Sequence, residues 1–119
     1  MILVDTSVWI EHFRKGNGQL SEYLLGGQAL CHPFIVGELA CGNLRNREEI
    51  LRMLTALPAV QVAEHSEVLH LVSSHGLSGQ GVGWIDAHLL ASTLLTSCTL
   101  WTFDKPLARA ARNLQISLD

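Results

Sequence analysis

Four acidic residues of this chain have placements that favour a shared chemical site: Asp5, Glu38, Asp86 and Asp104. Two of them lie at the ends of predicted strands. Asp5 closes the apolar segment 2–5, and Asp104 directly follows the apolar segment 99–103. Ligands of parallel sheets bind beyond the carboxyl ends of the strands. We therefore expect Asp5 and Asp104 to lie at the same edge of one sheet.

The other two acids lie on helices that are otherwise apolar. Glu38 follows Phe34 and Ile35 by four and three residues, so the three side chains share one helix face. Asp86 begins a helix over 84–95 that carries almost no other polar side chain. A carboxylate on an apolar face is costly to bury unless it is paired, hydrogen-bonded or bound to a cation.

A cluster of carboxylates would select a particular chemistry. Several of them cannot ionise side by side without a counter-charge. A site rich in oxygen and poor in nitrogen or sulfur favours a hard divalent cation, so we expect Mg²⁺ or Mn²⁺. Such a cation polarises a phosphoryl oxygen, lowers the pKa of water and supports phosphodiester cleavage.

Each acid taken alone has a structural alternative. Asp5 could initiate a turn before a helix that Thr6 or Ser7 caps, and Asp104 could belong to the turn Phe-Asp-Lys-Pro. Asp86 could cap its own helix, where the dipole favours an anion, and Glu38 could be an exposed helical glutamate. A single shared site accounts for all four acids together, which weighs against four separate explanations.

The elements that must position these residues alternate along the chain. Strands are expected at 2–5, 29–31, 60–62, 99–103 and 115–118. Helices are expected at 8–13, 20–25, 33–41, 45–57, 64–74, 84–95 and 105–113. This order predicts an α/β fold in which a parallel sheet of four or five strands is flanked by helices on both faces.

Composition predicts a single domain over residues 1–119. Of these residues 48% are hydrophobic and 16% are charged, which suits one packed core and excludes disorder. The chain shows no signal peptide and no apolar run long enough for a membrane span. Three cysteines without a C-x-x-C pair argue against a disulfide framework or a zinc ribbon. We expect a cytoplasmic protein that binds no membrane.

The net charge of −3 does not exclude a nucleic-acid partner, because the four acids account for it. Without them, eight basic residues face seven acidic ones. Arg14, Arg45 and Lys105 follow three of the acids in sequence and are candidates for contact with a phosphate chain. They could equally be ordinary charges of solvated helix faces.

Four segments together resemble the PIN-domain family, and within it the VapC-type toxins of toxin–antitoxin systems. They are VDTSVWIEHFR, PFIVGELACG, GVGWIDAHLLASTLL and LWTFDKPLARAA, and the resemblance runs from residue 2 to about residue 112. It implies that the four acids form the family's metal-binding catalytic quartet, and that Thr6 and Thr102 are its supporting hydroxyls. Phe103 departs from the family, which often has a basic residue there.

The resemblance also implies function and partners. It implies a PIN-like fold and a Mg²⁺- or Mn²⁺-dependent endoribonuclease that cleaves structured RNA such as tRNA or ribosomal RNA. It implies a cognate VapB-type antitoxin and a homodimer. A mean hydropathy of +0.25 in so short a chain also favours an apolar interface, for which we consider the helices at 20–25 and 45–57.

Two other functions remain open from the sequence. A phosphatase on a similar sheet could use Asp5 as its nucleophile, but the Asp-x-Asp pattern of such enzymes is absent because residue 7 is serine. A non-catalytic PIN-like module could bind RNA or a protein partner, although the presence of all four acids argues against it. The glycine-rich segment 76–83 lacks the Gly-Lys-Ser/Thr of a phosphate-binding P-loop.

Overall fold

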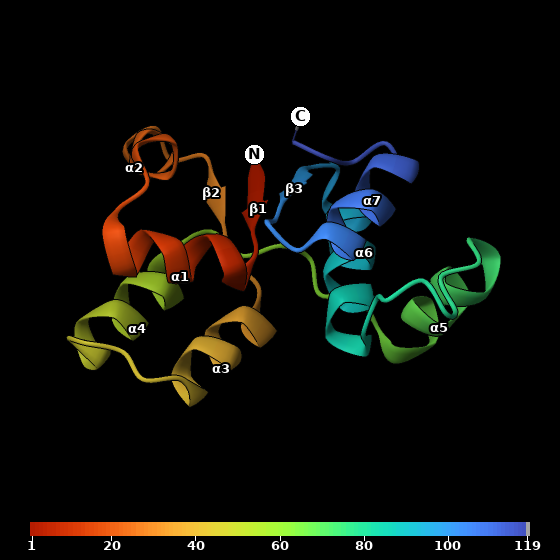
Figure 1. Ribbon diagram of the computed structural model, residues 1–119, viewed down its shortest axis with the longest axis horizontal. Coiled ribbons are helices and arrows are strands. Elements are labelled where there is room, and N and C mark those ends of the chain that lie inside the picture. The colour runs from red at the N-terminus through yellow and green to blue at the C-terminus, as the bar shows by residue number, and fades with distance from the viewer. Residues whose placement is uncertain (119) are drawn as a thin grey trace.

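A computed structural model describes residues 1–118, and within them three parallel strands are surrounded by seven helices (Figure 1). The strands are β1 (Ile2–Val4), β2 (Ala29–Leu30) and β3 (Thr99–Trp101). The helices are α1 (Thr6–Lys15), α2 (Gly18–Leu25), α3 (Pro33–Cys41), α4 (Arg47–Ala56), α5 (His65–Ser74), α6 (Trp84–Thr96) and α7 (Lys105–Asn113). The predicted α/β class and all seven predicted helices are confirmed, with ends that differ by a few residues.

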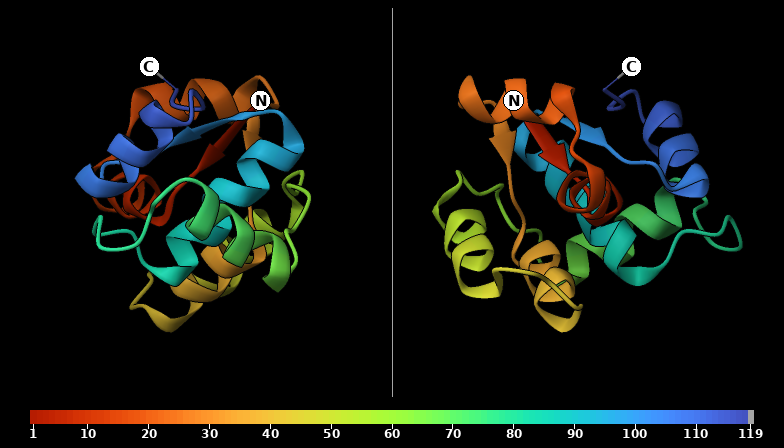
Figure 2. Two further views of the ribbon diagram at one scale, coloured as in Figure 1. Left: turned by 90° about the vertical axis from the view of Figure 1, so that its right-hand side faces the viewer. Right: turned by 60° about the vertical axis from the view of Figure 1, so that its left-hand side comes forward.

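The sheet has the order β2-β1-β3, and both pairs of neighbouring strands are parallel. Its central strand is fully buried, since Leu3 and Val4 are 0% exposed. Leu3 pairs with Leu30 on one side and with Leu100 on the other. The strands lie between α1–α4 on one side and α5–α7 on the other (Figure 1, Figure 2). The loops at the carboxyl edge of the sheet therefore start from a buried, fixed position.

The sheet has three strands, and the expectation of four or five was wrong. Residues 60–62 were predicted as a strand, but this segment joins the sheet only through a single bridge between Ala59 and Cys31. The ladder with β2 stops there because the next bond would need the amide of Pro33, which has no N–H and begins α3. The Gln61 amide faces the other side of the segment and donates to the Thr96 hydroxyl of α6 at 2.9 Å.

The predicted strand at 115–118 was wrong for a related reason. It makes a single bridge, between Ser117 and Leu100. Gln115 has a φ of 61°, so the chain turns sharply out of α7 just before the bridge. Leu100 of β3 donates to the Ile116 carbonyl and accepts from the Leu118 amide. These two backbone bonds of a single residue do not make a regular ladder.

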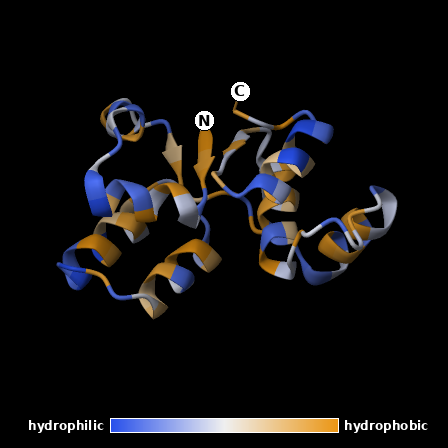
Figure 3. Cartoon of the chain, in the orientation of Figure 1, coloured by the Kyte–Doolittle hydropathy of each residue, from blue (hydrophilic) through white to orange (hydrophobic). Residues whose placement is uncertain are grey.

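Helix α6 runs from the core to the carboxyl edge of the sheet (Figure 1). Its residues Leu89 and Leu90 are 0% exposed, and the helix packs on β3 and on α5. Figure 3 shows hydrophobic residues along β1 and on much of α6, while the outer helices carry both hydrophobic and hydrophilic residues. Burial on several sides fixes the axis of α6, and with it the position of its first turn, which carries Asp86.

The cysteines and the helix lengths of residues 1–118 bear on two further expectations. Cys31, Cys41 and Cys98 are all free thiols, as the odd count suggested. Among residues 1–118, no helix combines the length and apolar character that a membrane span requires.

Candidate active site

Asp5 sits directly after β1 and is held by three hydrogen bonds. Its Oδ2 accepts from the Ser7 hydroxyl at 2.7 Å, the Thr102 hydroxyl at 2.8 Å and the Ser7 amide at 3.4 Å. The side chain is 6% exposed. Asp5 is itself the N-cap of α1, so the expectation that Thr6 or Ser7 caps this helix was wrong. The Asp5 carboxylate therefore caps α1 and also belongs to the candidate site.

Asp104 stands at the adjacent strand end, as the parallel sheet predicted. The Asp5 amide donates to the Trp101 carbonyl at 2.9 Å, which joins the ends of β1 and β3. Asp104 caps α7 by accepting from the Leu107 amide at 3.0 Å, and its own amide donates to the Thr102 hydroxyl at 3.0 Å. Thr102 therefore touches both acids, which agrees with a supporting role.

Glu38 reaches the same edge from α3. Helix α3 packs on α1, and the Thr6 hydroxyl donates to Glu38 Oε1 at 2.8 Å. Thr6 is the first residue of α1, next to Asp5. Glu38 is exposed but is not the isolated surface glutamate of the alternative explanation, because Thr6 fixes it beside the first acid.

Asp86 completes the group from the first turn of α6. Burial raises the pKa of its carboxyl to about 6, opposed by a weak bond from the Gly83 amide at 3.4 Å. Repulsion from Asp5, Asp104 and Glu38 raises the pKa further. The four carboxylates are therefore close enough to repel one another. Helix capping is the alternative explanation for Asp86, but its capping bond to the Gly83 amide is long.

No cation of the described chain balances these charges. The single ion pair within residues 1–118 joins Lys15 to Glu11, at 3.4 Å and away from the four acids. The predicted substrate contacts Arg14, Arg45 and Lys105 are exposed and form no ion pair with the acids in this part of the chain. Their exposure leaves them accessible to a phosphate chain, and that contact stays a prediction.

The four carboxylates fit a hydrated magnesium ion better than a closed metal cage. Among residues 1–118, no group of three or more acidic, histidine or cysteine side chains is close enough to enclose a metal ion. Structural zinc needs such a group of nitrogen and sulfur ligands. Mg²⁺ keeps several waters and takes only one or two carboxylates together with substrate phosphate. Asp5 is buried and Asp86 partly buried, whereas Glu38 and Asp104 are exposed.

Ser7 is a site residue that the sequence analysis missed. Its hydroxyl donates to Asp5, accepts from the Phe103 amide at 3.0 Å and lies 3.3 Å from the Thr102 hydroxyl. It thus ties the loop after β1 to the loop after β3. Its place two residues after an acid that ends a strand was the available signal, because such spacing allows a side-chain bond.

A row of rings borders the acids on the α3 and α6 side. His32 contacts Phe34 at a centroid distance of 4.9 Å, Phe34 contacts His88 at 4.8 Å, and His88 contacts Trp84 at 4.8 Å. Burial, with repulsion from His88 second, lowers the pKa of His32 to about 4. Trp84 is 41% exposed, two residues before Asp86, whereas Trp9 lies in the core.

The fold and this acidic edge define a class of protein. The chain matches the PIN domain family over residues 2–113 and belongs to that family. It is also similar to Ribonuclease VapC32 of Mycobacterium tuberculosis, strains CDC 1551 and H37Rv. Each is 44% identical over 119 residues, covering 99% of this chain and 96% of the relative. The resemblance to VapC-type toxins is confirmed.

Proposed function

We propose that this protein is a Mg²⁺- or Mn²⁺-dependent endoribonuclease that acts in the cytoplasm as the toxin of a toxin–antitoxin pair. The observation that carries the proposal is the convergence of Asp5, Glu38, Asp86 and Asp104 with no basic residue to neutralise them. The 44% identity to a ribonuclease of the VapC group supports the same activity. The phosphatase alternative has no comparable support.

The residues of the chain have separate roles in this proposal. A divalent cation supplies charge stabilisation and an acidified water for phosphodiester hydrolysis. Asp5 and Asp86 would hold the cation, and Glu38 and Asp104 would add negative charge beside it. Thr6 and Thr102 orient the carboxylates by donating to Glu38 and Asp5 at 2.8 Å each. The direct test is whether the purified protein cleaves RNA with Mg²⁺ or Mn²⁺ and stops when a chelator is added.

Replacing Ser7 with alanine should lower the rate of cleavage about tenfold while the fold persists. The substitution frees Asp5 to rotate and removes the link to the Phe103 amide. One such hydrogen bond stabilises a fold by about 1 kcal/mol. Ser21→Ala is the matched control, since Ser21 bonds the Asn17 carbonyl early in α2 and lies outside the site. Equal kcat values for the two variants would contradict a positioning role for Ser7.

An antitoxin segment has a suitable groove beside the acids. It is lined by Pro33, Phe34, Glu38 and Ile85, has a volume of about 550 Å³ and is mostly apolar. We propose that a VapB-type partner packs apolar side chains there. An Arg or Lys of the partner can then pair with Glu38 and its neighbours in place of the metal. The proposal fails if no small partner encoded nearby inhibits cleavage.

A homodimer is also proposed, but the exposed apolar residues favour another face than the sequence suggested. Leu25 is 90% exposed on α2, and α4 carries no large apolar residue with high exposure. Leu94 and Leu95 of α6 are both exposed, and they line a mostly apolar hollow together with Leu71 of α5. Leu94→Glu should therefore yield a monomer by light scattering at micromolar concentration, whereas Leu25→Glu should stay dimeric. The reverse result would place the interface on α2.

A further inference from the structure

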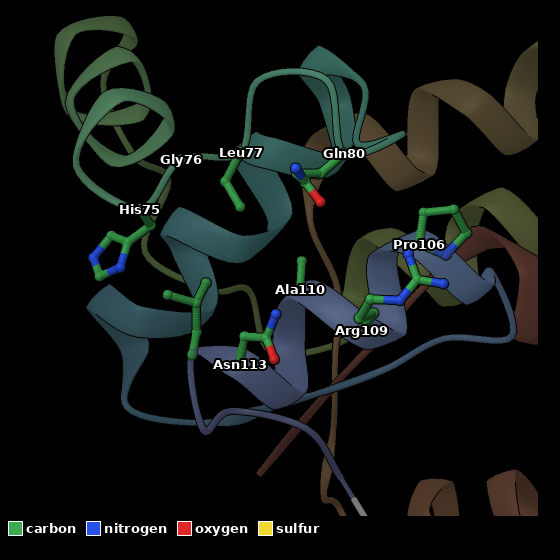
Figure 4. Close-up of a pocket in the computed structure, with 9 residues that line it drawn as sticks. His75, Gly76, Leu77, Gln80, Pro106, Arg109, Ala110 and Asn113 are labelled. Atoms are coloured by element: carbon green, nitrogen blue, oxygen red, sulfur yellow. The ribbon is translucent and has the colours of Figure 1, made fainter.

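A second hollow lies next to the acidic edge, between the glycine-rich loop 76–83 and α7. Its volume is about 410 Å³, within the range of roughly 300–1,000 Å³ that small-molecule sites occupy. Figure 4 shows Leu77 and Gln80 of the loop facing Pro106, Arg109 and Asn113 of α7. The pocket is thus formed by two segments that meet only in the folded chain.

The polar groups of this pocket have no partners of their own. Within residues 1–118, the side chains of His75, Gln80, Arg109 and Asn113 form no hydrogen bond or ion pair. No acidic residue is among those that line the pocket. A guanidinium and two carboxamides beside the apolar surface of Leu77 can therefore bond an incoming ligand without breaking an internal contact.

The loop that covers the pocket is tied closely to the catalytic edge. Gly81 has a φ of 79°, and a Cβ on it would come within 3.2 Å of the Pro106 side chain. Only glycine fits both the backbone and this contact. Pro106 follows Asp104 by two residues, and the Gly83 amide bonds Asp86. The loop before Asp86 and the helix that Asp104 caps therefore also form the pocket, so one RNA chain could contact the pocket and the acids.

We propose that this pocket binds one unpaired nucleotide of the RNA, adjacent to the phosphate that is cleaved. The proposal rests on the ribonuclease function above and names a subsite for it. Arg109 holds a phosphate by charge-assisted bonds. Gln80 and Asn113 bond the base edge, as amides do with adenine, while Leu77 and Pro106 cover the base face. Arg109 lies five residues after Asp104, about 7.5 Å along the helix axis.

The chemistry of the pocket distinguishes a nucleotide from other ligands. An inorganic anion would need only Arg109 and would leave the amides and the apolar floor unused. An acidic peptide would lack a flat ring for that floor. A base that is still stacked in a duplex could not enter a concave site of this size, so the nucleotide must come from a loop, a bulge or an end.

The test measures RNA binding without cleavage. Asp86→Asn protein with a chelator is titrated into a labelled single-stranded RNA of about ten nucleotides, followed by fluorescence anisotropy. Adding Arg109→Gln should weaken binding about fivefold and reduce the slope of log affinity against log salt by about 0.7. Gln80→Ala should weaken binding about threefold and leave the slope unchanged. Arg112→Gln removes the same charge from the same helix outside the pocket and should change the affinity less than twofold.

Competition by small molecules identifies the bound group. Adenosine monophosphate should displace the RNA at concentrations where inorganic phosphate does not, and Arg109→Gln should remove the difference. Equal effects of Arg109→Gln and Arg112→Gln, or equal competition by phosphate, would overturn the nucleotide site. If the wild-type protein cleaves no RNA with Mg²⁺ or Mn²⁺, the ribonuclease proposal itself is refuted. The binding measurements do not depend on cleavage, so the two failures are distinguishable.

Discussion

Replacing Asp86 with asparagine should reduce metal-dependent RNA cleavage by about a hundredfold or more without destabilising the fold. Asparagine keeps the shape of the side chain and an oxygen that can accept the bond from the Gly83 amide. It removes the charge that a divalent cation needs. Losses of this size are typical when a group that stabilises charge in the transition state is removed. The measurement is the initial rate of cleavage at saturating Mg²⁺, together with a thermal melt in chelator.

The expected stability follows from the direction of the pKa shift. The pKa of Asp86 is raised to about 6 in the folded protein, from 3.8. Ionisation therefore opposes folding: the cost grows from about pH 4 and is complete above about pH 6. At pH 7 asparagine removes that cost, which solvent access reduces to about 1 kcal/mol. The melting temperature in chelator should then be unchanged or a few degrees higher, and lower stability would mean that Asp86 is a structural cap.

Glu67→Gln is the matched control for this substitution. Glu67 is also an acid in the first turn of its helix, α5, and it accepts from the amide of the N-cap residue Glu64 at 2.8 Å. It differs from Asp86 in lying outside the group formed with Asp5, Glu38 and Asp104. Glu67→Gln should leave cleavage unchanged. Loss of cleavage in both variants would show that the substitutions act through helix capping.

Asp5 should respond differently from Asp86 to the same substitution. Its Oδ2 accepts three hydrogen bonds inside the protein, from Ser7 and Thr102. Hydrogen bonds to a charged group are stronger than neutral ones. Asp5→Asn should therefore abolish cleavage and also destabilise the fold by about 1 kcal/mol.

Much of this site could be predicted because its acids obey general rules. Asp5 and Asp104 were found from the rule that parallel strands end at one edge, and the register of β1 with β3 confirms the arrangement. Glu38 and Asp86 were found because carboxylates on apolar helix faces need an explanation. Both types of reasoning depend on local patterns, which the sequence contains in full.

The features that could not be predicted depend on contacts between distant segments. Residues 60–62 form no strand because the neighbouring chain leaves β2 and enters α3 at Pro33, and the sequence pattern of the segment does not contain that limit. The role of Ser7 depends on the amide of Phe103, 96 residues away. Arg14, Arg45 and Lys105 are exposed to solvent, and their contact with a phosphate chain stays a prediction.

Metal binding should stabilise the protein and release protons, with a pH dependence that reports Asp86. At a Mg²⁺ or Mn²⁺ concentration about 100 times the Kd, the free energy of unfolding rises by about 2.7 kcal/mol, and the melting temperature by roughly 10 °C. A chelator should reverse the shift. The carboxylate binds metal only when ionised, so cation and proton compete for it.

That competition fixes the sign of the pH effect. With a pKa of about 6, Asp86 is about half protonated at pH 6 and almost fully ionised at pH 8. Calorimetry in buffers of different ionisation enthalpy should therefore detect release of about half a proton per bound ion at pH 6 and almost none at pH 8. Below pH 6 the affinity should fall by up to about tenfold per pH unit. In Asp86→Asn protein any residual binding should release no proton at pH 6, and an equal release would assign the titrating group to another residue.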